Sequence, residues 1–127
     1  MVSDAMVIAP SKGDLVTSEV SGYLELLQKE GSKDLLGKAM DALNDWIPNS
    51  KEEVELELNA ELWCRLGRLA LAHNQPKVAL FTAESALKNG DPRVLKKDYA
   101  QIPITRLRWY AVAQALYGES LHRLLDG

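Results

Sequence analysis

The sequence predicts an all-α protein, because apolar residues recur at helical spacing while aromatic residues are few and strand-like alternation is hard to find. The chain has 127 residues, of which 46% are hydrophobic, 26% charged and 6% aromatic. This length suits a single domain with a substantial core, and the composition is far from that of disordered proteins. We therefore expect one folded domain of about five helices.

The first helical pattern begins after residues 1–13, which lack a sustained period and are expected to form a loose arm. From Asp14 apolar residues recur at helical spacing, and Gly31 suits the position just after a helix end. A second helix is predicted between a cap at Ser32 and a stop at Pro48. Its expected apolar stripe comprises Leu35, Leu36, Ala39, Met40, Leu43, Trp46 and Ile47.

A third helix is predicted from Ser50 to about His73. Ser50 and Glu53 match a capping box, in which the hydroxyl and the carboxylate satisfy free amides at the helix start. Pro76 suits the first position of a fourth helix, which should reach Gly90. The connection between these helices is short, so we expect them to be antiparallel neighbours.

Residues 91–104 are predicted to be a connector, because they contain two prolines and mixed polarity. A short helical turn is expected around residues 94–98. Thr105 is expected to cap a last helix over about 105–125. Residues 14–127 should therefore form one helical-repeat domain, with a repeat hairpin at about 60–93.

An internal repeat indicates how these helices are arranged. Residues 38–43, followed by Pro48, align with residues 82–87, followed by Pro92, at an offset of 44. The segments that begin at Trp63 and Trp109 align at an offset of 46. Periods of this size are typical of stacked helical hairpins, so we expect a short α-solenoid.

Residues 60–93 resemble a tetratricopeptide repeat (TPR), whose pattern is W-x2-L-G-x2-Y, then A-x3-F, then A and P. The match is degenerate, because Ala70 replaces the usual tyrosine, Ala83 replaces a large aromatic residue, and the repeat exceeds 34 residues. The resemblance implies a right-handed stack of antiparallel hairpins. The residues expected to pack its helices together are Trp63, Leu66, Gly67, Ala79 and Ala86, with Trp109 at the equivalent position of the last helix.

Residues 108–121, with the pattern R-W-Y-x-V-A-x-x-L-Y-G-x-x-L, are similar to segments of the very large scaffold proteins of the motile-cilium axoneme, notably those of the central apparatus. This similarity implies a piece or short form of a longer solenoid, located in the cytoplasm or in the ciliary cytoskeleton. Its expected partners are helical-repeat or acidic structural subunits of a large complex. A compact free-standing domain is the alternative.

Charge is distributed unevenly along the chain. Residues 1–63 contain 13 acidic and 5 basic residues, whereas residues 64–127 contain 5 acidic and 10 basic residues. The TPR resemblance places Arg65 and Arg68 on the concave side, beside Cys64, where they could bind an acidic segment. A second basic cluster around the connector is either ordinary solvated charge or a docking surface for an acidic protein. Its members are Arg93, Lys96, Lys97, Arg106 and Arg108.

The sequence predicts no catalytic, cofactor or metal site. His73 and His122 lie far apart and are expected at the surface, and no base is evident for Cys64. The acidic residues near the start of the third helix suit the positive end of its dipole. No small-molecule substrate is evident, and the net charge of −3 without interleaved aromatics disfavours nucleic acid as a partner.

The cysteine count, the hydropathy and the absence of a catalytic motif indicate the compartment and the function. A single cysteine fits a reducing compartment, and no apolar run approaches the roughly 18 residues of a membrane span. We expect a non-catalytic scaffold that either is marginally stable alone or stacks by its ends through Trp109, Leu116 and Leu121. The alternatives are a small adaptor that holds one acidic peptide or helix in its groove, and an accessory subunit of an enzyme complex.

Overall fold

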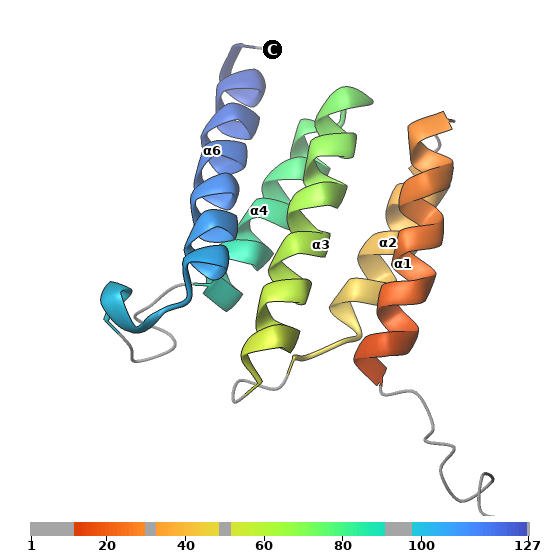
Figure 1. Cartoon of the computed structure of the whole chain (residues 1–127). Helices are drawn as coiled ribbons and strands as arrows, with labels where there is room; N and C mark the ends of the chain where they lie inside the picture. Colours follow the sequence, from red (N-terminus) through yellow and green to blue (C-terminus); the bar gives the residue numbers. More distant parts are fainter. Residues whose placement is uncertain (1–11, 30–32, 49–51, 91–97, 127) are drawn as a thin grey trace, which may run out of the picture.

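The computed structural model describes residues 12–29, 33–48, 52–90 and 98–126, and this part of the chain is helical with no strands (Figure 1). The prediction of an all-α protein with about five helices is therefore confirmed. The α-helices are α1 (Lys12–Lys29), α2 (Lys33–Asn44), α3 (Glu53–Ala72), α4 (Pro76–Gly90) and α6 (Ile104–Asp126), and a 3₁₀-helix, η2 (Tyr99–Gln101), precedes α6.

The helix α3 lies at the centre of the molecule and contacts all four other α-helices. In Figure 1, α1, α3 and α6 stand side by side, and the fainter α2 and α4 lie behind them. The helix α2 packs on α1 and α3, whereas α4 packs on α3 and α6. The row of α1, α3 and α6 therefore presents one face that neither α2 nor α4 covers.

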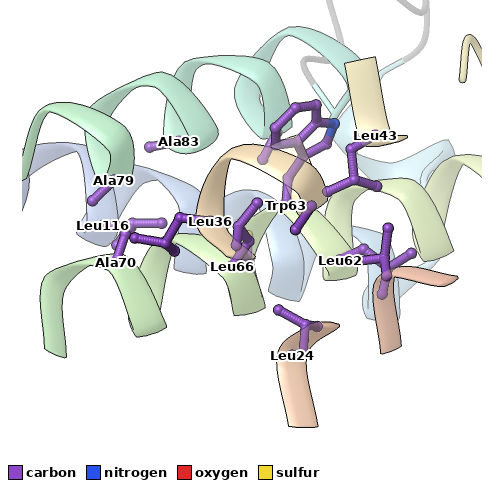
Figure 2. Close-up of a cluster of buried hydrophobic side chains, with 14 of the residues drawn as sticks. Leu24, Leu36, Leu43, Leu62, Trp63, Leu66, Ala70, Ala79, Ala83 and Leu116 are labelled. Atoms are coloured by element: carbon purple, nitrogen blue, oxygen red, sulfur yellow. The ribbon is translucent and has the colours of Figure 1, made fainter. Parts of the chain in front are cut away.

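The hydrophobic core draws side chains from all five α-helices. Figure 2 shows a central part of it, with leucines of α1, α2, α3 and α6, the Trp63 ring and alanines of α3 and α4. Ala79, Ala83 and Ala86 are fully or almost fully buried, so the backbone of α4 can approach its neighbours closely. A Cβ atom added at Gly67 would collide with the Thr82 hydroxyl and the Leu116 side chain. The helices α4 and α6 therefore approach α3 closely at Gly67.

The connection between α3 and α4 has the predicted form. The helix α3 ends at Ala72, and the N–H of the C-cap residue His73 bonds to the Leu69 carbonyl at 3.0 Å. Asn74 has a φ of 57°, in the left-handed region that asparagine tolerates better than most residues. Pro76 then occupies the first position of α4, where its missing N–H is not needed.

The predicted capping box does not describe the start of α3. The N-cap is Glu52, whose side chain makes no capping hydrogen bond, and Ser50 lies outside the described residues. Because Glu53 is the first helical residue rather than the third, it cannot occupy the position that a capping box requires. The helical turn expected around residues 94–98 also lies outside the described residues, apart from Asp98, which precedes η2.

Three residues near helix ends differ from the prediction: Trp46, Ile47 and Thr105. Because α2 ends at Asn44, Trp46 and Ile47 leave the helical register: Trp46 is buried, and Ile47 is 88% exposed instead of lying on the apolar stripe. The helix α6 begins one residue before its expected cap, and the N–H groups of Arg106 and Leu107 bond to the Pro103 carbonyl. The Thr105 hydroxyl instead donates to the Glu57 carboxylate at 2.9 Å, which ties α6 to α3.

Candidate groove on the face of α1, α3 and α6

A groove crosses the face formed by α1, α3 and α6, and consists of three adjoining hollows. The first, of about 390 Å³, lies between α1 and α3, and the second, of about 430 Å³, spans α1, α3 and α6. A third, of about 360 Å³, follows α3 and α6. Arg65 lines the first two hollows and Arg68 the second and third, so the floor of the groove is continuous along the exposed side of α3.

The central hollow combines apolar and charged walls. Its apolar part comes from Leu24 of α1, Leu69 of α3 and Trp109 of α6. Leu24 is 7% exposed, and Leu69 and Trp109 are half-buried, because most of each side chain packs into the core. The polar part contains Gln28 and Glu61 with three arginines: Arg65, Arg68 and Arg108. A ligand segment would therefore need both apolar and anionic side chains.

The central hollow carries excess positive charge. Arg65 is paired with Glu61 at 2.9 Å, one helical turn away on α3, so this carboxylate neutralises one of the three guanidinium groups. The Arg108 guanidinium lies 5.4 Å from the ring centroid of Trp109, a cation–π contact that leaves its charge uncompensated. Within the described part of the chain, neither Arg68 nor Arg108 forms an ion pair. Two cationic groups therefore remain available to an anionic partner.

Cys64 does not line the groove, although the TPR resemblance places it there. Its side chain is fully buried between α3 and α6, with Sγ 3.7 Å from the Trp109 carbonyl oxygen. Burial raises the pKa of the Cys64 thiol to about 12, while the nearby Arg68 lowers the pKa and Glu61 raises it. Cys64 is therefore a protonated thiol at neutral pH, which is unsuited to nucleophilic chemistry.

Of the predicted basic residues, the structure brings together Arg65, Arg68 and Arg108 and separates Arg106 from them. Arg106 is 4% exposed and shares the buried face of α6 with Ala113 and Ser120, because residues seven positions apart lie on the same side of a helix. Its expected place in an exposed basic cluster is therefore wrong. Arg93, Lys96 and Lys97 lie outside the described residues.

The residues expected to pack the repeat helices are buried or half-buried. Trp63 is 2% exposed and meets the Phe81 ring edge-on, with ring centroids 5.9 Å apart. Leu66, Ala79 and Ala86 are also buried. Trp109 is half-buried, with its backbone carbonyl over Cys64 and its ring under Arg108. Trp109 thus contributes to the groove as well as to packing.

Sequence reasoning missed the contribution of α1 to the groove. Leu24 and Gln28 are one turn apart on α1 and both border the first two hollows. The helical period of α1 marks Leu24 as apolar, but only the packing of α1 beside α3 places Gln28 opposite Arg65. A sequence pattern within one helix carries no signal for this arrangement.

Neither histidine is arranged for catalysis or metal binding. The His73 Nε2 atom lies 2.7 Å from the Leu27 carbonyl oxygen and so joins the end of α3 to α1. His122 is exposed and lies 2.9 Å from Asp126 on α6. Across the described ranges, no group of three His, Cys, Asp or Glu residues could hold a metal ion. None of the described helices has the length and apolarity that a membrane crossing requires.

No family model matches this chain, and no curated protein and no solved structure matches it. Function must therefore be inferred from the geometry and charge of the groove.

Proposed function

We propose that this protein is a non-catalytic interaction module, a short right-handed TPR-like α-solenoid that holds subunits of a larger assembly. Its groove binds a helical or extended segment of another protein that carries acidic and apolar side chains. The observation on which the proposal depends is a pair of arginines, Arg68 and Arg108, that form no ion pair with any described residue. They lie beside the apolar patch of Leu24, Leu69 and Trp109.

The pattern of helix contacts supports the solenoid part of the proposal. In a stack of antiparallel hairpins, the first helices of successive hairpins form one row and the second helices form another. The row of α1, α3 and α6 and the positions of α2 and α4 fit this description, with each rear helix contacting two members of the row. Gly67 and the buried alanines of α4 supply the close contacts that such stacking requires.

The charge of the groove supports an acidic partner. Exposed ion pairs are individually weak, about 0.2 to 1 kcal/mol, so Arg68 and Arg108 mainly speed association and select for anionic segments. Burial of apolar side chains against Leu24, Leu69 and Trp109 supplies most of the affinity. The assembly suggested by the sequence similarity is the motile-cilium axoneme, where acidic or helical-repeat structural subunits would be the partners.

A small adaptor that holds one soluble client in the same groove is the second candidate, favoured by the size of the central hollow. Purification of the full-length chain from its native source distinguishes the two functions. A scaffold co-purifies with several large structural proteins, whereas an adaptor returns one soluble client.

Binding of defined peptides tests the groove directly. The probe is a fluorescent 20-residue amphipathic helix of Leu and Glu, compared with the same peptide in which Lys replaces Glu. We expect the acidic peptide to bind more tightly at low salt. Replacing Arg68 and Arg108 together with glutamate should weaken its binding by about 10-fold in fluorescence anisotropy.

The matched control is Lys77→Glu, a charge reversal at an exposed position of α4, outside the groove. This variant should bind the acidic peptide as the parent chain does, and circular dichroism should show equal helicity for all variants. Equal affinity for the two peptides, or equal effects of the groove and control substitutions, would contradict the proposal.

A further inference from the structure

The helix α6 has an exposed side that borders the groove, because Ala111 and Ala115 also line the third hollow. Ile104 and Leu125, near its two ends, are 82% and 83% exposed. Between them lie exposed small residues, and a Cβ atom added at Gly118 would meet nothing within 4 Å. We call this side the outer stripe of α6. Its residues are Ile104, Arg108, Ala111, Ala115, Gly118 and Leu125, with His122 between the last two.

The spacing of the outer stripe is that of a helix–helix seam. Its positions alternate between steps of four and three residues from 104 to 125, so they form one nearly straight line along α6. At 1.5 Å per residue the line is about 32 Å long. Gly118 weakens the helix, yet neither a positive φ nor a close neighbour within the chain requires a glycine there.

We propose that a second copy of this chain binds the outer stripe, with the two α6 helices antiparallel about a two-fold axis between Gln114 and Ala115. Reversal about this point exchanges position 104 with 125 and position 111 with 118. Ile104 then faces Leu125 of the partner subunit, and Ala111 faces Gly118 of the partner subunit. The two most exposed apolar residues of α6 thus cover each other, while small residues at the centre let the helices approach closely.

Charge at the edge of the stripe fits the same pairing. Arg108 and Glu119 lie on the same side of the stripe, and both are exposed. In the antiparallel dimer Arg108 lies within one helical turn of Glu119 of the partner subunit, and each dimer contains two such pairs. Arg108 has no ion pair among the described residues, and Glu119 pairs with Arg123 of its own helix at 3.2 Å. This contact therefore gives the Arg108 charge a partner when the groove holds no acidic segment.

A head-to-tail stack fits less well. The exposed apolar side of α1 extends only from Leu15 to Leu26, about half the length of the outer stripe, so α1 would leave one end of the stripe uncovered. The end contact expected from the sequence, through Trp109, Leu116 and Leu121, is wrong in its residues. Leu116 is 4% exposed, and Trp109 lines the groove rather than the outer stripe, so neither contributes to this contact.

The dimer should be weak, because a single pair of helices buries less than the roughly 1,200–2,000 Å² of stable complexes. We expect a monomer–dimer equilibrium in sedimentation experiments at micromolar to millimolar concentrations of the full chain. Ala115→Glu places two carboxylates at the two-fold axis and should weaken the dimer by at least 10-fold. The control Ser18→Glu, at an exposed position of α1, should leave the equilibrium unchanged.

Disulfide trapping tests the register. Ala115→Cys should form a disulfide-linked dimer under mild oxidation, because the two introduced thiols meet at the axis, and the buried native thiol of Cys64 does not compete. Gly22→Cys, on the exposed side of α1, should stay unlinked. Three results would each overturn the proposal. The chain could be monomeric at every concentration, or the Ala115→Glu variant could associate like the parent chain. In a mixture of the two cysteine variants, Ala115→Cys could also link preferentially to Gly22→Cys.

Discussion

At the scale of single residues, Gly67 shows how one side chain can be excluded by its surroundings. An added Cβ atom collides with Thr82 of α4 and Leu116 of α6, both of which are buried and cannot move into solvent. Gly22 of α1 is the opposite case, since nothing lies within 4 Å of an added Cβ atom. The two glycines therefore have opposite roles although both lie inside helices.

Alanine substitution should separate these roles. Gly67→Ala should lower the free energy of unfolding by about 1–3 kcal/mol through overpacking. Gly22→Ala should raise it by about 0.5–1 kcal/mol, because alanine favours the helix and meets no obstacle. Urea denaturation of both variants measures the difference. Shifts of the same sign would mean that Gly67 does not lie at a close contact between helices.

At the scale of secondary-structure elements, polar ties near the helix ends fix how α3 sits between its neighbours. The Trp46 indole donates to the Glu55 carboxylate at 2.9 Å, which joins the segment after α2 to the start of α3. Near the opposite end of α3, the Arg123 guanidinium of α6 donates to the Leu71 carbonyl at 2.8 Å. The Leu71 carbonyl also accepts the Asn74 N–H at 3.0 Å, so Arg123 adds a second, charged donor near the negative end of the helix dipole.

The tie between α6 and α3 should be measurable. Arg123→Met removes the hydrogen bond to Leu71 and should lower the free energy of unfolding by about 1.5–3 kcal/mol, the usual range for bonds to charged groups. Arg123 also pairs with Glu119 at 3.2 Å on the surface of α6. The control Glu119→Gln removes only that exposed pair and should cost about 0.5 kcal/mol or less. Thermal denaturation that gave equal losses for both variants would assign the effect to the ion pair.

At the scale of the whole molecule, stability should differ between the two sides of α3. On one side α4 and α6 pack on α3 and on each other, around Gly67 and the alanines of α4. On the other side α1 and α2 form a pair that also rests on α3, but the first hollow of the groove opens between α1 and α3. The α1–α2 pair is therefore the part most easily detached.

Native-state hydrogen exchange should reveal this difference. Amides in α1 and α2 should exchange through openings of lower free energy than amides in the middle of α3 and in α4. Arg65→Ala, which alters the groove without removing core contacts, should leave the order unchanged. If α1 and α2 exchanged only through global unfolding, together with α3 and α4, the molecule would be a single cooperative unit.

The sequence by itself determined the helices and most of their boundaries. Helical periodicity, proline and glycine influence the backbone conformation within a few residues, so they can be interpreted without the tertiary structure. Pro76 marks the start of α4, and the apolar period identified Leu24, Leu43 and Leu66 as core residues. The predicted start of α3 at Ser50 was wrong, because the N-cap is Glu52. Ser50 and Glu53 match the residue types of a capping box, but the position at which the helix begins depends on the path of the preceding segment.

The tertiary structure alone decided which polar residues share a surface. Arg106 and Arg108 are two positions apart, yet Arg106 lies on the buried face of α6, while Arg108 lies over Trp109 at the groove. Gln28 and Arg68 belong to different helices and line the same hollow only because α1, α3 and α6 stand in one row. Local patterns specify the faces of each helix, but the distances between helices follow from side-chain packing across the core, which no single segment encodes.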